Sequence, residues 1–198
     1  MAQCFLLGGS QLVKYEIETT AALEEHARLS IAFNVASKMV AEPLNSPVGG
    51  WSLREVSVAS PYVKDYDEGG PPTLRPYWDT SQWRIVSAFV ADGRVGGAMV
   101  ACRTAGSDFL EGREDIAAIW DIRVAPEWRG KGIGTGLFDT VVRYAKSIGC
   151  VELKIETQDV NVGACRFYAK QGCKLTDVIP EAYPDWPGET ELIWRLTI

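Results

Sequence analysis

A glycine-rich segment at residues 129–134, which reads R-G-K-G-I-G, carries the clearest chemical signal in the sequence. It follows an apolar run and opens a stretch with helical periodicity. Glycines let a backbone approach a ligand closely, and the N–H groups and dipole at the start of a helix favour negative charge. The segment therefore predicts a phosphate-binding loop.

Two common phosphate-binding motifs do not fit this segment. The Walker loop G-x-x-x-x-G-K-[ST] fails because Ala125 stands where its first glycine belongs. The dinucleotide motif G-x-G-x-x-G fails because its last glycine is replaced by Thr135 when counted from Gly130, or by Leu137 when counted from Gly132. The pattern that remains is R-x-x-G-x-G directly after a strand, with a plain turn as the alternative interpretation.

A second pattern lies further along the chain. Residues 155–168 read I-E-T-Q-D-V-N-V-G-A-C-R-F-Y and contain N-x-x-A-x-x-F-Y, followed by Gly172. Found in this order, with a helix and a strand between them, the two motifs resemble the GNAT superfamily of N-acetyltransferases. The chain looks most like streptothricin acetyltransferases, on E-T-Q-D-x-N, on D-I-x-V before the loop and on a closing W-x-L. Cys173 departs from the aromatic residue that usually follows the glycine.

This resemblance implies a fold and a cosubstrate. The fold is α/β (α+β), a single GNAT domain over residues 1–198 with a mixed, mostly antiparallel central sheet and helices on both faces. A splay is expected between the strands ending near Val124 and Glu156. The cosubstrate is acetyl-CoA, and the resemblance predicts that it binds Ile122, Arg123, Val124, Arg129, Gly130, Lys131, Gly132, Ile133, Gly134, Thr135, Asn161 and Ala164.

The same resemblance suggests catalytic residues. Tyr168 matches the tyrosine that acts as general acid in many GNAT enzymes, and a tyrosine packed on a helix is the alternative. Glu156 lies five residues before Asn161, where some N-terminal acetyltransferases of the family have a catalytic glutamate. We predict Glu156 as the base, with a structural hydrogen-bond acceptor as the alternative role.

The strand before the loop bears on substrate binding. In a regular strand, Ala118 and Trp120 share the face of Ile122 and Val124, so this face offers no carboxylate. Asp121 points the other way unless a β-bulge reverses it, and we expect it to bind the substrate ammonium.

An acidic loop is predicted at residues 61–76, and it contains Asp65 and Tyr66. We expect these two residues to line a site for a cation. A charge run that is merely solvated is the alternative interpretation.

The resemblance implies an acyltransferase that moves acetyl from acetyl-CoA to a primary amine of a small cationic acceptor. Streptothricin is the acceptor it suggests, and acetylation would then give resistance to this antibiotic. A protein N-terminal or lysine acetyltransferase is the alternative. A non-catalytic acetyl-CoA-binding sensor is an alternative of another class, and the presence of Tyr168 and Asn161 weighs against it.

Periodicity and turn residues indicate the elements that position these residues. We expect helices over residues 21–29, 135–148 and 162–170, and strands over residues 11–17, 51–58, 83–91, 94–102, 117–124, 151–156 and 191–198. Residues 30–40 fit either a longer helix or a strand. An Asp92-Gly93 turn predicts a hairpin, and His26 is expected on the exposed side of the first helix.

Composition narrows the range of partners. The chain has 198 residues, 46% of them hydrophobic, and a net charge of -6, which disfavours a nucleic-acid binder. Its five cysteines lack C-x-x-C spacing and His26 is its one histidine, so we expect no metal and interpret Cys150 and Cys165 as small buried residues. Without a signal peptide or a long apolar run, a cytoplasmic protein with no membrane contact is expected, as a monomer or a homodimer.

Overall fold

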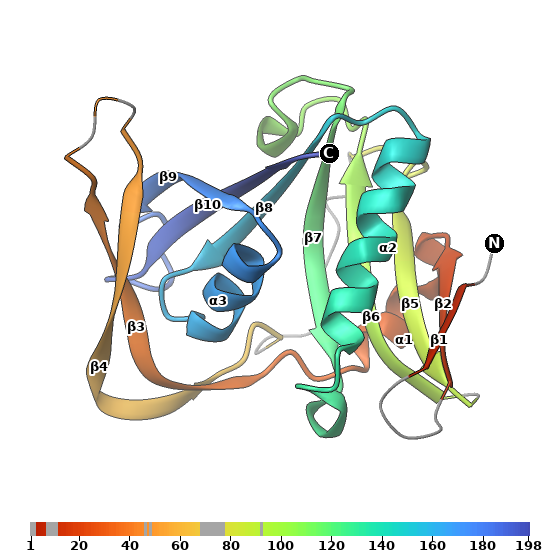
Figure 1. The fold of residues 1–198 in the computed structure, drawn as a ribbon, viewed down its shortest axis with the longest axis horizontal. Helices are drawn as coiled ribbons and strands as arrows, with labels where there is room; N and C mark the ends of the chain where they lie inside the picture. The colour runs from red at the N-terminus through yellow and green to blue at the C-terminus, as the bar shows by residue number, and fades with distance from the viewer. Residues whose placement is uncertain (1–2, 7–11, 46, 48, 68–77, 92) are drawn as a thin grey trace. The chain divides into compact units, whose positions relative to one another are not determined.

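The computed structural model describes residues 3–6, 12–45, 47, 49–67, 78–91 and 93–198 (Figure 1). Its elements fall into two compact units. The first comprises residues 1–31, 66–153 and 198, and the second comprises residues 32–65 and 154–197. Neither unit is continuous in sequence, and the single domain over residues 1–198 stays a prediction, as does the splay between strands.

An antiparallel sheet forms the centre of the first unit, in the strand order β1-β2-β5-β6-β7 (Figure 1). Its strands are β1 (Gln3–Leu6), β2 (Leu12–Glu18), β5 (Arg84–Val90), β6 (Gly93–Cys102) and β7 (Ile116–Val124). The other elements are η1 (Thr20–Ala22), α1 (Leu23–Ala27), η2 (Asp108–Leu110), η3 (Pro126–Trp128) and α2 (Ile133–Ser147). The predicted hairpin is confirmed as β5 and β6, with Val90 opposite Gly93.

Two helices cover opposite faces of this sheet. A side chain at Gly97 would meet His26 of α1, whereas one at Gly96 would meet Ile133 and Leu137 of α2. Successive residues of a strand point to opposite faces, so α1 and α2 lie on opposite sides of β6. This arrangement gives the first unit the helices expected on both faces of the sheet.

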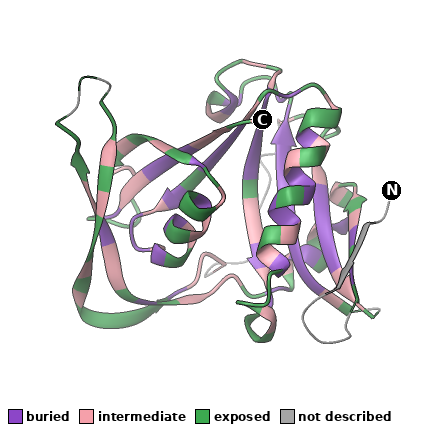
Figure 2. Cartoon of the chain, in the orientation of Figure 1, coloured by how far each residue is buried: buried purple, intermediate pink, exposed green. Residues whose placement is uncertain are grey.

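Helix α2 follows its predicted apolar pattern and starts two residues before the predicted 135–148. Leu137, Phe138, Val141 and Ala145 are buried, as their helical spacing predicts. Figure 2 shows the neighbouring strand β6 buried along most of its length. Gly149 follows the helix with a φ of +86°, a left-handed conformation that suits glycine at a helix end.

The second unit contains two sheets and one helix. Strands β3 (Phe33–Pro43) and β4 (Trp51–Lys64) form an antiparallel pair. Strand β10 (Thr190–Thr197) lies between β9 (Lys174–Pro180) and β8 (Glu152–Gln158), of which residues 154–158 belong to this unit. Helix α3 (Val162–Lys170) packs on the strands β8, β10 and β9, where Oγ1 of Thr157 on β8 lies 3.7 Å from Sγ of Cys165.

Several predicted bounds are corrected by the structure. Residues 30–40, which fitted either a helix or a strand, form a strand from Phe33 onward. The helix predicted over residues 21–29 is instead the short 3-10 helix η1 followed by the five-residue helix α1. Residues 61–64 of the predicted acidic loop continue β4, while residues 68–76 of that loop lie outside the described residues. Strand β9 was not predicted.

The expected exposure of His26 is wrong, because its side chain is fully buried. The imidazole occupies space left by Gly97 on β6, where an added Cβ would lie 2.4 Å from Nδ1 of His26. A glycine in a distant strand therefore allows a polar ring to enter the core.

Candidate active site

The predicted phosphate-binding loop connects η3 to α2 in the first unit. Gly130 and Gly132 adopt left-handed φ values of +72° and +84°, which other residues resist. Gly132 is the N-cap of α2 and has no side chain with which to cap it. The first N–H groups of a helix lack partners inside the helix, so this end favours an anion.

The loop has room for a ligand. Residues 129–132 are exposed, and an added Cβ at Gly130 would meet no other atom within 4 Å. Ile133, the next residue, is buried and anchors the start of α2 in the core. This geometry fits a pyrophosphate held by backbone N–H groups.

The basic side chains of the loop make contacts within the protein. Arg129 donates from Nε to the carbonyl oxygen of Val124 at 2.9 Å and from Nη2 to that of Ser30 at 3.0 Å. Nζ of Lys131 lies 4.7 Å from the ring centre of Trp128. In this structure the Arg129 side chain therefore stabilises the glycine-rich loop by binding the end of β7.

We expect Gly130→Ala to weaken acetyl-CoA binding about tenfold. The methyl group would occupy space open to the pyrophosphate and keep one backbone N–H donor from reaching a charged oxygen of the ligand. Titration calorimetry with acetyl-CoA measures this effect. Gly149→Ala is the matched control, since Gly149 also has a positive φ, +86°, and open space around it. Equal losses of affinity in both variants would contradict a ligand-binding role for Gly130.

Strand β7 contains a β-bulge at Trp120. Met99 of β6 pairs with Asp121 and the next residue, Val100, pairs with Ile119, so Trp120 has no partner in the register. The bulge places Asp121 on the face of Ala118, and Ile122 on the other. The expectation of a regular strand with residues 118, 120, 122 and 124 on one face is therefore wrong.

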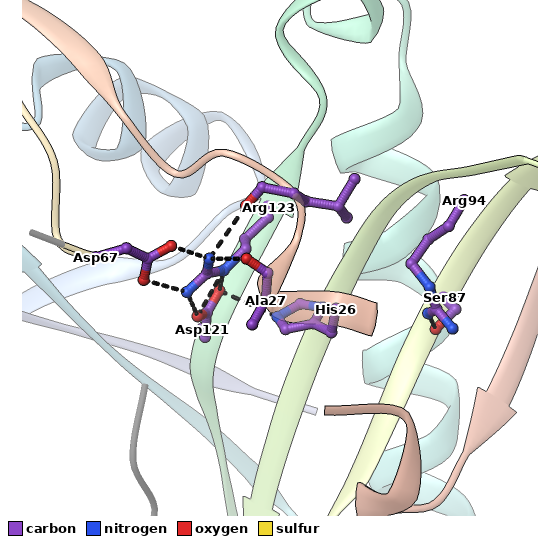
Figure 3. A network of polar contacts seen from close by, with 8 residues as sticks. His26, Ala27, Asp67, Ser87, Arg94, Asp121 and Arg123 are labelled. Atoms are coloured by element: carbon purple, nitrogen blue, oxygen red, sulfur yellow. Dashed lines mark hydrogen bonds and ion pairs between the residues drawn. The ribbon is translucent and has the colours of Figure 1, made fainter. Parts of the chain in front are cut away.

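Asp121 belongs to a buried network of charges in the first unit (Figure 3). Nη2 of Arg123 donates to Asp121 Oδ2 at 2.6 Å and to Asp67 Oδ1 at 3.0 Å. Nη1 donates to the carbonyl oxygen of Leu29 at 3.1 Å. His26 faces the same carboxylate, with Nε2 3.3 Å from Oδ1 but without the alignment of a hydrogen bond.

The two charges at the centre of this network stabilise each other. Burial opposes the ionised form of Asp121, but His26 and Arg123 outweigh it and hold the pKa of this carboxyl below its ordinary value. Burial likewise opposes the charge on Arg123, while Asp121 and Asp67 raise the pKa of the guanidinium. The Asp121 carboxylate, 6% exposed, is thus already neutralised by a cation of the protein.

The two other predicted substrate residues lie beside this network in sequence. Asp65 and Tyr66 are partly exposed, whereas Asp67, which follows them, binds Arg123 together with Asp121. Contact of Asp65 and Tyr66 with a substrate stays a prediction.

The N-x-x-A motif has a structural reason in helix α3 of the second unit. The side-chain oxygen of Asn161 accepts a hydrogen bond from the N–H of Ala164 at 3.1 Å, so Asn161 caps the helix. Tyr168, one turn after Ala164 in the same helix, is 2% exposed, and its ring centre lies 5.2 Å from that of Phe167. The roles of Asn161 and Ala164 in cofactor binding and of Tyr168 in catalysis stay predictions.

Glu156, the predicted base, is exposed on β8 of the second unit. Its Oε1 accepts a hydrogen bond from Oη of Tyr183 at 2.7 Å. On the neighbouring strand, burial raises the pKa of Glu191, and the charge of Glu156 adds to this effect. The sequence reasoning missed Tyr183, because no local pattern links the loop after β9 to β8.

The four cysteines whose burial the structure describes, Cys102, Cys150, Cys165 and Cys173, are buried and unsuited to nucleophilic chemistry. Cys150 and Cys165 are buried, which confirms their interpretation as small core residues. Burial raises the pKa of Cys165 to about 11 and that of Cys173 to about 12, so both thiols stay protonated at neutral pH.

Residues 52–173 match the Acetyltransferase (GNAT) family, and the chain belongs to this family. Streptothricin acetyltransferase from Streptomyces lavendulae is 33% identical over 144 residues, which cover 72% of each chain. Streptothricin acetyltransferase A from Bacillus subtilis strain 168 is 27% identical, over 73% of this chain and 77% of the relative. A Bacillus anthracis str. Ames structure in complex with acetyl coenzyme A superposes with a TM-score of 0.70 at 20% identity, over 93% of this chain and 99% of that one.

These similarities confirm the predicted fold class and the enzyme class. The chain has the α/β GNAT fold with a mixed, mostly antiparallel sheet, and it is an acetyl-CoA-dependent acetyltransferase rather than a non-catalytic sensor. No helix among the described residues is long and apolar enough to span a membrane. The described part of the chain also contains no group of three or more His, Cys, Asp or Glu residues arranged to hold a metal ion.

Proposed function

We propose that this enzyme transfers acetyl from acetyl-CoA to a primary amine of a small cationic acceptor, and that streptothricin is this acceptor. The observation that carries the proposal is the alignment of 144 residues, at 33% identity, with streptothricin acetyltransferase from Streptomyces lavendulae. The net charge of -6 favours a cationic substrate over an anionic one. Acetylation would remove a positive charge from the antibiotic.

In the proposed reaction, acetyl-CoA supplies the acetyl group as a thioester. Residues 129–135, with Gly130 and Gly132 in left-handed conformations, hold the pyrophosphate through backbone N–H groups. Ile122 and Val124 offer backbone groups to the pantetheine arm and polarise the carbonyl as an oxyanion hole does. Arg123 and Asp121 support this strand from its other face, so Asp121 acts on the substrate only indirectly.

Glu156 receives the proton of the amine, directly or through an ordered water molecule. An ordinary glutamate with a pKa near 4.3 removes a proton from an ammonium near 10.4 only at a cost of roughly 8 kcal/mol. The amine must therefore lose much of its basicity on binding, or lose its proton before attack. Tyr168 donates a hydrogen bond to the departing thiolate.

The test measures CoA release from acetyl-CoA after addition of streptothricin, with an aminoglycoside, a polyamine and a peptide amine in parallel. We expect turnover with streptothricin, and a loss of about a hundredfold or more in kcat for Glu156→Gln. Glu152→Gln is the matched control, since Glu152 lies on the same strand and pairs with Arg113 at 3.4 Å. Its kcat should be unchanged.

Two results would change the assignment. Turnover of the peptide amine without turnover of streptothricin would replace the antibiotic with a protein acceptor, which is the alternative function. Full activity of Glu156→Gln would remove Glu156 from the mechanism and leave the acetyltransferase activity itself intact.

A further inference from the structure

The loop between β9 and β10 is closed by its own hydrogen bonds. The N–H of Trp186 donates to the carbonyl oxygen of Tyr183 at 3.0 Å, and the N–H of Glu189 donates to that of Trp186 at 3.2 Å. The N–H of Gly188 donates to Oε2 of Glu181 at 2.8 Å. These successive turns hold the aromatic residues of the loop in a defined arrangement.

Lys64 of strand β4 also holds the β9–β10 loop in place, through contacts with two of its residues. Nζ of Lys64 lies 2.6 Å from Oε1 of Glu189, and both side chains are at least nine-tenths buried. The same ammonium lies 3.9 Å from the ring centre of Trp186. A buried ion pair and a cation–π contact therefore set the position of the Trp186 ring.

Trp186 in turn supports Tyr183. Their ring centres are 6.0 Å apart, with an angle of 58° between the ring planes. The hydroxyl group of Tyr183 reaches Oε1 of Glu156 at 2.7 Å. A chain of contacts thus runs from the ion pair of Lys64 and Glu189, through two aromatic rings, to the exposed carboxylate on β8.

We propose that Tyr183 is a positioning residue for acetyl transfer, which orients the Glu156 carboxylate through its hydroxyl group. This inference rests on the proposed role of Glu156 as base. A glutamate side chain has several rotamers, and a donor fixed on one oxygen restricts them. The second oxygen then faces a constant direction and accepts the proton of the amine.

The test is Tyr183→Phe, which removes the hydroxyl group and keeps the ring that packs on Trp186. We expect kcat to fall about tenfold, since one hydrogen bond to a charged group is lost, with the KM for acetyl-CoA unchanged. Tyr144→Phe, the same chemical change within α2, should leave both quantities unchanged.

A double-mutant cycle separates this inference from the proposed function. In a Glu156→Ala background, which has no acceptor for the hydroxyl group, Tyr183→Phe should cause no further loss of kcat. An equal tenfold loss in both backgrounds, or wild-type kcat in Tyr183→Phe, would overturn the positioning role. Wild-type activity of Glu156→Ala would instead overturn the proposed base.

A thermal melt of Tyr183→Phe checks the fold of the variant. An unchanged melting temperature together with a reduced kcat supports positioning. A melting temperature lowered in step with kcat would show that the hydroxyl group serves only the stability of the loop.

Discussion

Arg123→Met is expected to destabilise the protein by about 3 to 5 kcal/mol at neutral pH, because it leaves the buried carboxylate of Asp121 without its cation. The guanidinium, 1% exposed, also binds Asp67 and the carbonyl oxygen of Leu29. Urea unfolding at pH 7 measures the loss. Arg113→Met is the matched control, since Arg113 and Asp115 form a surface pair, 38% and 49% exposed, and its loss should lower the stability far less.

The pH dependence of this loss has a definite sign. In the wild type the pKa of Asp121 is lowered, so its contribution is present above the unfolded value of about 3.9 and disappears as the pH falls through the folded value. In Arg123→Met the unpaired carboxylate destabilises the fold only while it is ionised. The difference in stability between wild type and variant should therefore narrow in acid, and a difference independent of pH would contradict this account.

Gly136→Ala is expected to cost about 2 to 3 kcal/mol, through overpacking against Tyr15. An added Cβ would lie 2.1 Å from Oη and 2.3 Å from Cζ of Tyr15, a ring that is 3% exposed and packs between β2 and α2. The helix and the ring cannot both keep their positions. Thermal and urea unfolding measure the loss, and acetyl-CoA affinity should fall as well because the start of α2 is displaced.

Gly163→Ala is the matched control for this substitution. Gly163 lies in the first turn of α3, where the nearest atom to an added Cβ is Oδ1 of Asn161 at 3.8 Å. Alanine is the better helix former, so this variant should gain about 0.5 to 1 kcal/mol. Similar stability changes in the two glycine variants would show that contact with Tyr15 does not decide the effect.

Elements with strong local signals could be predicted from the sequence. The range 162–170 predicted for α3 is the observed one, because Asn161 caps its start and Gly172 follows its end with a φ of +85°. The hairpin of β5 and β6 was also recognised, since β-rich runs flank a turn signal. In both cases residues close in sequence contain the information.

Features that depend on distant partners could not be predicted. The bulge at Trp120 arises in the pairing of β7 with β6, and no neighbouring residue in the sequence indicates the shift in register. The burial of His26 depends on Gly97, which lies in another strand. Consequently the placement of Ala118 on the face opposite Ile122, and the pairing of Asp121 with Arg123, had to come from the structure.

Only those parts of the candidate site that belong to sequence motifs could be predicted. The glycine loop and Glu156 follow from spacing and resemblance, and the structure places the first at the start of α2 and the second on an exposed strand position. No sequence motif identifies Tyr183 or Lys64. The contact of Tyr183 joins the β9–β10 loop to β8, and that of Lys64 joins β4 to the same loop, so both link residues far apart in the chain.

The attachment of the β9–β10 loop to β4 bears on how acceptor preference can change during evolution. Glu156, Tyr183, Trp186 and Lys64 all lie in the second unit, whereas the glycine loop lies in the first. If Tyr183 orients Glu156 as we propose, a substitution that shifts Lys64 or Trp186 changes the direction of the carboxylate and leaves the residues of the glycine loop unchanged. Descendants of one such enzyme could diversify toward new amines while their glycine loop is preserved.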